Sequence, residues 1–163
     1  MCRLGRRHFH LRHGCVVAMV AVVAVAGSVA PAARANDRET AVAVLTAQLE
    51  LLKEQKALNK CLEASPDKNT PCITKKSLII ATLAARHIKL IRAAMDGSEA
   101  PCVRTVAKQE LNFLQIWRDG ALALNRNERK KAKRLFVQSI EISDAQRKLQ
   151  PRCFAEVLAA PGP

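Results

Sequence analysis

The sequence predicts an all-α protein: a disulfide-stapled, up-down-up-down four-helix bundle with a short C-terminal helix or tail. Three observations support this prediction. Apolar residues recur at spacings of three and four along most of the chain, and no stretch alternates as a strand does. Proline, glycine and asparagine interrupt the pattern at short connections, which favour antiparallel neighbouring helices. Four cysteines lie close to the predicted helix ends.

The N-terminus has the order of a secretory signal peptide. Residues 1–13 contain four arginines and no acidic residue, residues 14–30 are apolar and nearly uncharged, and Ala33-Arg34-Ala35 is a small-x-small triplet. We expect cleavage after Ala35, which makes residues 1–35 the signal peptide and leaves residues 36–163 as one helical domain, periplasmic or secreted. The alternative is an uncleaved anchor, but about 17 apolar residues is short for a membrane-spanning helix.

Composition narrows the classes of partner. The mature chain of 128 residues would carry 22 Lys and Arg against 14 Asp and Glu, a formal charge of +8. Aromatic residues make up 3% of the sequence and Tyr is absent, so we expect an aliphatic core. The same scarcity argues against base stacking on single-stranded nucleic acid, which makes nucleic acid an unfavoured partner.

The first two helices have recognisable ends. The first is expected to start at Asn36 or Asp37, either of which can serve as an N-cap, and to end at Ser65-Pro66. The second is expected to start near Thr70-Pro71, in the cap-then-proline order, and to end at Asp96-Gly97, where glycine suits a left-handed cap. The core-facing stripe predicted for the first helix consists of Val42, Leu45, Leu49, Leu52, Leu58, Cys61 and Leu62.

The last two helices are interrupted by residues that weaken helices. The third is expected from about Pro101 to Arg118, with Asp119-Gly120 bending it before one more turn. The fourth starts near Asn127 and ends at Gln150-Pro151, because proline lacks the backbone N–H that an internal helical position needs. The remaining residues then form the short final helix or tail.

The predicted topology pairs the cysteines. Cys61 ends the first helix and Cys72 opens the second, whereas Cys102 and Cys153 lie at the opposite end of the bundle. A disulfide needs its Cα atoms within about 7 Å, and helices of this length separate the two ends by roughly 30 Å. Only Cys61–Cys72 with Cys102–Cys153 satisfies both conditions. A redox or metal role is the less favoured interpretation, because the chain has no Cys-x-x-Cys.

Neither catalysis nor a cofactor finds support in the motifs. After signal removal only His87 remains among the histidines, and no Gly-rich phosphate loop or Gly-x-Ser-x-Gly elbow occurs. We therefore predict a protein that is not an enzyme and that binds no metal or cofactor. His87 lies one turn from Leu83 and Ile91 on an apolar stripe, and we interpret it as a histidine at the edge of the core. The alternative is a pH-responsive group.

A basic run opens the fourth helix. Cations near a helix N-terminus oppose the helix dipole, and only Glu128 offsets them locally. A locally unfavourable pattern without compensation hints at function, although a solvated face is the plain alternative. Val137 and Ile140 lie near the same face, so the patch would mix basic and apolar side chains. The candidate binding residues are Arg126, Arg129, Lys130, Lys133 and Arg134.

These observations favour an exported, non-enzymatic protein that binds another macromolecule, such as an inhibitor, an immunity-type antidote or an envelope assembly factor. The alternative is a cationic protein that binds anionic lipid, lipopolysaccharide or nucleic acid through the basic face of the fourth helix. A third interpretation is a small apolar ligand held in the core, where the stripes contain the small residues Ala84, Ala94, Ala107, Ser139 and Ser143.

Overall fold

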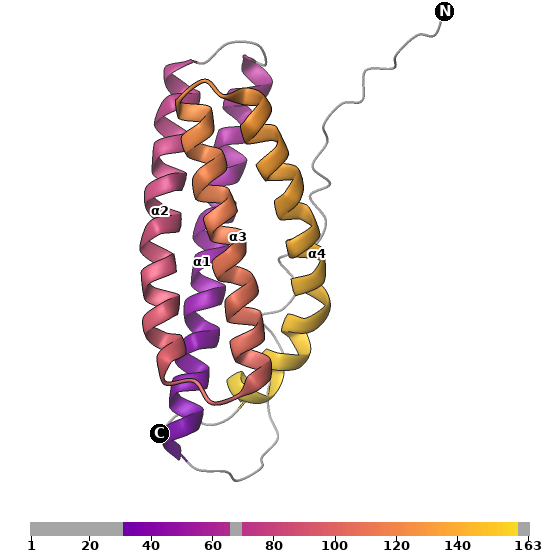
Figure 1. Ribbon diagram of the computed structural model, residues 1–163. Coiled ribbons are helices and arrows are strands. Elements are labelled where there is room, and N and C mark those ends of the chain that lie inside the picture. Colours follow the sequence, from indigo (N-terminus) through magenta and orange to yellow (C-terminus); the bar gives the residue numbers. More distant parts are fainter. Residues whose placement is uncertain (1–30, 66–69, 160–163) are drawn as a thin grey trace, which may run out of the picture.

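The computed structural model describes residues 31–65 and 70–159, and Figure 1 shows four α-helices that lie side by side. They are α1 (Pro31–Ala64), α2 (Pro71–Asp96), α3 (Pro101–Asn125) and α4 (Arg129–Ala159). The described residues contain no strand, so the predicted all-α class and the number of helices are confirmed. Most of the predicted signal peptide, residues 1–30, lies outside the described part of the chain, and the expected cleavage point after Ala35 falls within α1.

The four helices do not pack equally closely. α2 packs extensively against both α1 and α3, and α3 packs extensively against α4. In contrast, α1 contacts α4 no more than it contacts α3, its diagonal neighbour. In Figure 1 the α3–α4 connection lies at the same end as the C-terminus of α1, and the α2–α3 connection lies at the other end. The side of the bundle between α1 and α4 is therefore the least closed.

The core is aliphatic, as the composition predicts. Within the described residues, the fully buried aliphatic side chains of largest volume come from α1, α2 and α3. α4 contributes smaller or polar side chains to the interior until its last turns, where Phe154 is buried. The largest of the fully buried aliphatic side chains are Val44, Leu51, Leu58, Ile73, Ile80, Ile91, Val103, Val106 and Leu114.

Both ends of α2 depend on a particular residue type. Thr70 Oγ1 accepts a hydrogen bond from Ile73 N at 3.4 Å, and Pro71 takes the first helical position, as predicted. The predicted end at Asp96-Gly97 is confirmed, because Gly97 is the C-cap residue of α2, but its φ of −97° shows that it is not the expected left-handed cap. Glycine is needed there for space: a Cβ at residue 97 would lie 2.6 Å from Asn36 Nδ2. The small residue lets α1 pass close to the α2–α3 connection.

Asp37 caps a different helix from the one predicted. Because α1 already includes Asn36 and Asp37, neither residue is its N-cap. The buried Asp37 carboxylate instead accepts hydrogen bonds from Ser98 Oγ at 2.6 Å and from the backbone N–H groups of Glu99 and Ala100 at 2.9 and 3.0 Å. Ala100 is the N-cap residue of α3 and has no side chain that can cap it. A carboxylate from α1 therefore satisfies the N-terminus of α3, where negative charge is favourable.

α3 continues through Asp119-Gly120 to Asn125, so these two residues do not interrupt the helix. Gly120 is buried beneath α4, and a Cβ at this position would lie 2.6 Å from a ring carbon of Phe136. The Phe136 ring packs on Trp117 with ring centroids 4.5 Å apart. Glycine is retained because it admits this aromatic ring against the backbone of α3, and packing outweighs the modest helix penalty of glycine.

α4 also continues past its predicted end. The helix runs through Pro151 to Ala159, and Figure 1 shows it bent in its last turns. Proline leaves the carbonyl four residues earlier, at the exposed Arg147, without its helical donor, and water can replace that donor. The buried Cys153 and Phe154 hold the final turns against the bundle, which compensates for the interrupted hydrogen bonding.

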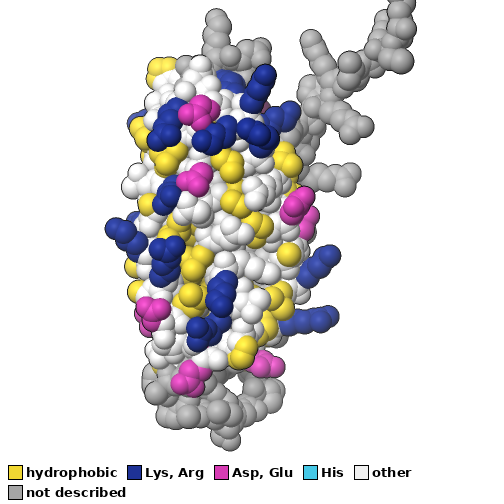
Figure 2. Space-filling model, in the orientation of Figure 1, with side chains coloured by type: hydrophobic (Ala, Val, Ile, Leu, Met, Phe, Trp, Pro, Cys, Tyr) yellow, Lys and Arg dark blue, Asp and Glu magenta, His cyan; other side chains and the backbone are white. Residues whose placement is uncertain are grey.

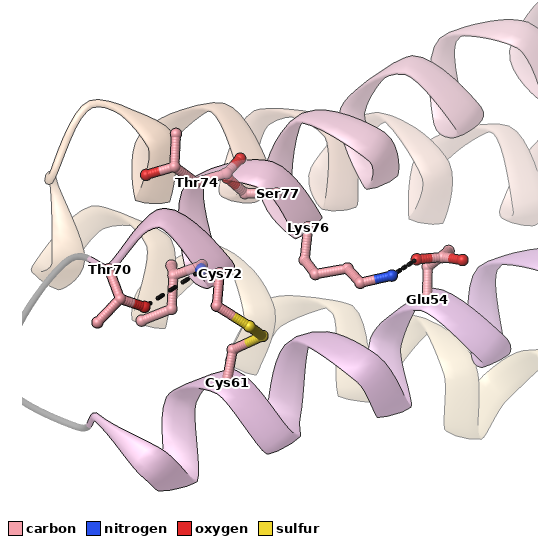
Figure 3. Close-up of a disulfide and its surroundings, with 8 residues drawn as sticks. Glu54, Cys61, Thr70, Cys72, Thr74, Lys76 and Ser77 are labelled. Atoms are coloured by element: carbon pink, nitrogen blue, oxygen red, sulfur yellow. Dashed lines mark hydrogen bonds and ion pairs between the residues drawn. A yellow bond between two sulfur atoms is a disulfide. The ribbon is translucent and has the colours of Figure 1, made fainter.

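Two disulfides join the helices as predicted. Cys61 pairs with Cys72 and Cys102 pairs with Cys153, with Cα atoms 5.8 and 5.4 Å apart. Figure 3 shows the first bridge between the last turns of α1 and the first turn of α2. The ion pair between Lys76 and Glu54 lies nearby on the same two helices (Figure 3). Each end of the bundle is therefore covalently linked.

Candidate functional site

The apolar stripe predicted to bury α1 lies only in part in the core: Leu45 and Leu62 pack against the edge of the core, and Val42, Leu49 and Leu52 lie outside it. Val42 is 48% exposed and Leu49 is 59% exposed, while Leu45 and Leu52 are half-buried. Further along the predicted stripe, Leu58 and Cys61 are buried and Leu62 is half-buried. The residues of α1 that do form the core are Ala41, Val44, Ala47, Leu51, Leu58 and Cys61. α1 therefore has two apolar stripes, and the sequence interpretation chose the wrong one for its N-terminal half.

Polar contacts to three helices fix the rotation of α1. Gln48 Nε2 donates to Glu110 Oε2 of α3 at 2.8 Å and to Gln150 Oε1 of α4 at 3.0 Å. Glu54 accepts a hydrogen bond from Lys76 Nζ of α2 at 2.9 Å. The hydrogen bonds that Asp37 accepts before α3 and the disulfide from Cys61 to Cys72 of α2 also hold α1 in this rotation. Together these contacts turn the second apolar stripe away from the core.

The uncovered side of α1 forms an open groove. It is lined by Leu49, Leu52, Lys53, Lys56, Ala57 and Lys60, so apolar side chains and lysines share it and none of the lining residues is acidic. The three lysines are exposed and have no ion-pair partner in the described part of the chain. We call Val42, Leu45, Leu49 and Leu52 the outer stripe, and these lysines its basic border.

The predicted basic patch is mostly exposed. Lys130, Lys133 and Arg134 lie on the solvent side of α4, whereas Arg129 is half-buried. Arg126 does not belong to α4: it is the C-cap residue of α3 and lies in the connection before α4 starts at Arg129. Figure 2 shows Lys and Arg side chains gathered toward the end of the bundle where α3 joins α4.

Two features of this patch agree with the sequence interpretation. Val137 and Ile140 are 44% and 39% exposed, so apolar side chains lie beyond the basic run on the same helix. Glu128 precedes α4 and pairs with Lys131 at 3.4 Å, which offsets part of the positive charge. The patch is a mixed basic and apolar surface.

His87 is buried, with 2% of its side chain exposed. Its Nε2 lies 3.0 Å from Glu50 Oε2, and the exposed Arg86 guanidinium contacts the same carboxylate oxygen. His87 is therefore among the fully buried side chains, and its ring reaches a carboxylate that is 42% exposed. The pH response of His87 stays a hypothesis, and Glu50 and Arg86 are the charged groups that would accompany it.

A buried carboxylate lies between α1, α3 and α4 and was not predicted. Glu110 is fully buried, and its Oε2 accepts hydrogen bonds from Gln48 Nε2 at 2.8 Å and Gln146 Nε2 at 2.5 Å. Burial raises the pKa of the Glu110 carboxyl from 4.5 to about 7, although both hydrogen bonds lower it. Within the described residues its Oε1 has no hydrogen-bond partner. A carboxyl with this pKa is partly protonated at neutral pH.

The sequence contained a signal for this buried group. Glu110 lies three residues after Ala107 and four before Leu114, so it occupies a core position of the apolar pattern of α3. The apolar residue next to it, Leu111, is only half-buried. A charged residue at a helical core position marks a buried polar network, and that criterion would have identified it.

Comparisons with known proteins give no relative. The chain matches no known family model, no curated protein and no solved structure. Within residues 31–65 and 70–159, no helix is long and apolar enough to cross a membrane. The same residues contain no group of three or more His, Cys, Asp or Glu side chains placed to hold a metal ion.

Proposed function

We propose that this protein is a non-enzymatic, exported helical protein that binds a partner protein through the outer stripe of α1. A single observation carries the proposal: Val42 and Leu49 are exposed, and Leu52 is only half-buried, on a helix whose other side is tightly packed. Exposed apolar rows of this kind are typical of interaction sites, because burying them on a partner removes apolar area from water. The proposed role is an inhibitor, an immunity-type antidote or an envelope assembly factor.

The two disulfides support the proposed compartment. Disulfides persist in oxidising environments such as the periplasm or the cell exterior, and both bridges lie at bundle ends, where they resist fraying. The proposed scaffold is an up-down-up-down bundle with the last turns of α4 folded against one end. A rigid scaffold of this kind presents a surface at low entropic cost on binding.

A pull-down with matched variants tests the proposal. The oxidised protein is immobilised, exposed to an envelope extract and eluted in a salt gradient, and we expect one protein retained at moderate salt. The double variant Val42→Ser, Leu49→Ser should lose that protein. The control is Leu78→Ser, Leu90→Ser, because these α2 leucines are 45% and 50% exposed and match the outer pair in exposure. Equal retention by both variants would place the interaction elsewhere and refute the proposal.

The basic patch of α4 supports a second candidate function, the binding of anionic lipid, lipopolysaccharide or another polyanion. The observation that favours it is the exposure of Lys130, Lys133 and Arg134 together with the apolar Val137 and Ile140. A basic and apolar surface can lie on anionic head groups.

Charge neutralisation tests this second candidate. Replacing Lys130, Lys133 and Arg134 by Gln should abolish sedimentation with phosphatidylglycerol vesicles, and binding of the unaltered protein should fall steeply with salt. The matched control removes three exposed charges of α2 by replacing Lys75, Lys89 and Arg92 with Gln. The same loss in both variants would mean that only net charge matters, and no loss in either would exclude the patch.

A further inference from the structure

The spacing of the outer stripe describes the shape of what can cover it. Val42, Leu45, Leu49 and Leu52 follow one another at intervals of three, four and three, which is the a–d–a–d order of a heptad pattern. At 100° per residue the four side chains fall within an arc of about 80°, and at 1.5 Å per residue they extend over roughly 15 Å of the helix axis. This narrow row matches the seam along which one helix packs on another.

The charges around the stripe describe the partner's composition. In the same register Lys53 and Lys60 take e positions, which flank the seam, and Lys56 takes the next a position. The nearest carboxylates of α1 point elsewhere, because Glu50 contacts Arg86 and His87 of α2 and Glu54 pairs with Lys76. The border of the groove is therefore wholly basic and calls for acidic side chains on the covering element.

Two other occupants fit less well. A second copy of this chain would bring its own basic border toward the first, and the mature chain would carry a formal charge of +8. Like charges across an interface are unfavourable, so self-association through this groove is opposed. A lipid surface would meet a narrow apolar row without needing its heptad spacing. Neither accounts for the spacing and the charge together.

We propose that the groove binds an amphipathic α-helix of a partner protein, with apolar residues in heptad spacing and acidic residues beside them. The helix would lie along α1 as a fifth helix, with its apolar seam on the outer stripe and its carboxylates on Lys53, Lys56 and Lys60. This inference rests on the proposed function, which assigns the outer stripe of α1 to a protein partner. Helix-in-groove recognition supplies the affinity through the apolar seam and the orientation through the charges.

A designed peptide tests this directly on the oxidised protein. The probe is a labelled peptide of about three heptads with Leu at a and d and Glu at e and g. We expect it to bind, measured by fluorescence anisotropy, and to gain helicity on binding, measured by circular dichroism. One control peptide has Lys in place of Glu, and a second has the same composition with its leucines out of heptad order. Both are expected to bind at least about tenfold more weakly, because each loses one half of the recognition.

Variants locate the site of binding. Leu49→Ser should weaken peptide binding about tenfold, and replacing Lys53, Lys56 and Lys60 by Gln should weaken it by a similar factor at low salt. Leu90→Ser on α2 is the matched control and should leave binding unchanged. Unfolding curves of each variant separate lost binding from lost folding.

Three results would overturn the inference. If the control peptide with its leucines out of heptad order binds as tightly as the designed peptide, the binding depends on charge alone. The protein can instead form a dimer that Leu49→Ser dissociates, which would make a second copy the occupant. Phosphatidylglycerol vesicles can bind in a Leu49-dependent way while the peptide does not, which would assign the groove to lipid. If the peptide fails but an extract protein is lost with Val42→Ser, Leu49→Ser, the proposed function stands and only the helical partner is refuted.

Discussion

The two apolar stripes of α1 lie in different environments. The inner stripe, which includes Val44, Leu51 and Leu58, is almost completely buried. The outer stripe has the more regular row of large side chains, yet Val42 and Leu49 are about half exposed or more, at 48% and 59%. The difference teaches that apolar periodicity identifies faces able to be buried, whereas contacts between helices decide which face the core receives.

Small side chains and polar contacts explain the choice. Ala41 and Ala47 on the inner stripe let α1 approach its neighbours closely, as small residues do at helix contacts. Thr40 Oγ1 donates to Ala94 O of α2 at 2.9 Å, and Asp37 caps α3, so the N-terminal half of α1 is held by its inner side. Rotating the outer stripe inward would break these contacts and leave buried polar groups unsatisfied.

The largest expected effect is the difference in unfolding free energy between substitutions of Leu51 and of Leu49. Leu51→Ala should lower the free energy of unfolding by about 2–5 kcal/mol, because it leaves a cavity at a side chain that is 1% exposed. Leu49→Ala should change it by no more than about 0.5 kcal/mol, because that side chain is mostly in water. Denaturant unfolding monitored by circular dichroism measures both. Equal losses would mean that both stripes are buried in solution.

The second effect concerns Glu110, which joins α1 to α3 and α4. Its pKa is raised from 4.5 to about 7 in the folded protein, so the protonated form favours folding and its contribution is complete below pH 4.5. As pH rises through 7 this contribution is lost, up to about 3 kcal/mol at 1.36 kcal/mol per pKa unit. Glu110→Gln keeps a neutral side chain and should remove that loss.

Unfolding free energies measured from pH 4 to pH 9 test this expectation. As pH rises, the Glu110→Gln variant should become progressively more stable than the unaltered protein. Taking the difference between their unfolding free energies removes the contribution of all other titrating groups. A constant difference across that range would show that Glu110 titrates at its ordinary pKa.

The smallest of these effects tests what holds α1 in its rotation. Asp37→Ala removes the cap on α3 and should cost about 0.5–2 kcal/mol of unfolding free energy. Asp37→Asn keeps a side-chain oxygen that can accept from the N–H groups of Glu99 and Ala100, so it should retain most of the stability. Thermal unfolding of the two variants provides the comparison. If the Asp37→Ala variant were as stable as the unaltered protein, the hydrogen bonds of Asp37 would not help to hold α1 in its rotation.

The sequence was sufficient where local chemistry decides the structure. Thr70-Pro71 predicts the start of α2, and a bundle with antiparallel neighbours leaves one pairing for the four cysteines. It was insufficient where distant contacts decide it. Gly97 ends α2 as predicted, and Gly120 was expected to bend α3, but the sequence does not show that both also make room for a side chain of another helix. Only tertiary packing reveals that role.

The candidate sites divide in the same way. The exposure of Lys130, Lys133 and Arg134 followed from charge alone, since charged side chains are seldom buried. The groove on α1 was missed because its two leucines, Leu49 and Leu52, had been assigned to the core. Heptad spacing cannot distinguish a stripe that packs inside its own bundle from one that is left for a partner.

Solvent access to individual methyl groups measures the central difference most directly. Methyl NMR spectra of the unaltered, oxidised protein are recorded with and without a soluble gadolinium chelate, which broadens signals of side chains that it can approach. The account predicts strong broadening of Val42 and Leu49 and protection of Val44 and Leu51. Protection of all four would contradict it, because the outer stripe would then be covered in the isolated protein and not free to receive a partner.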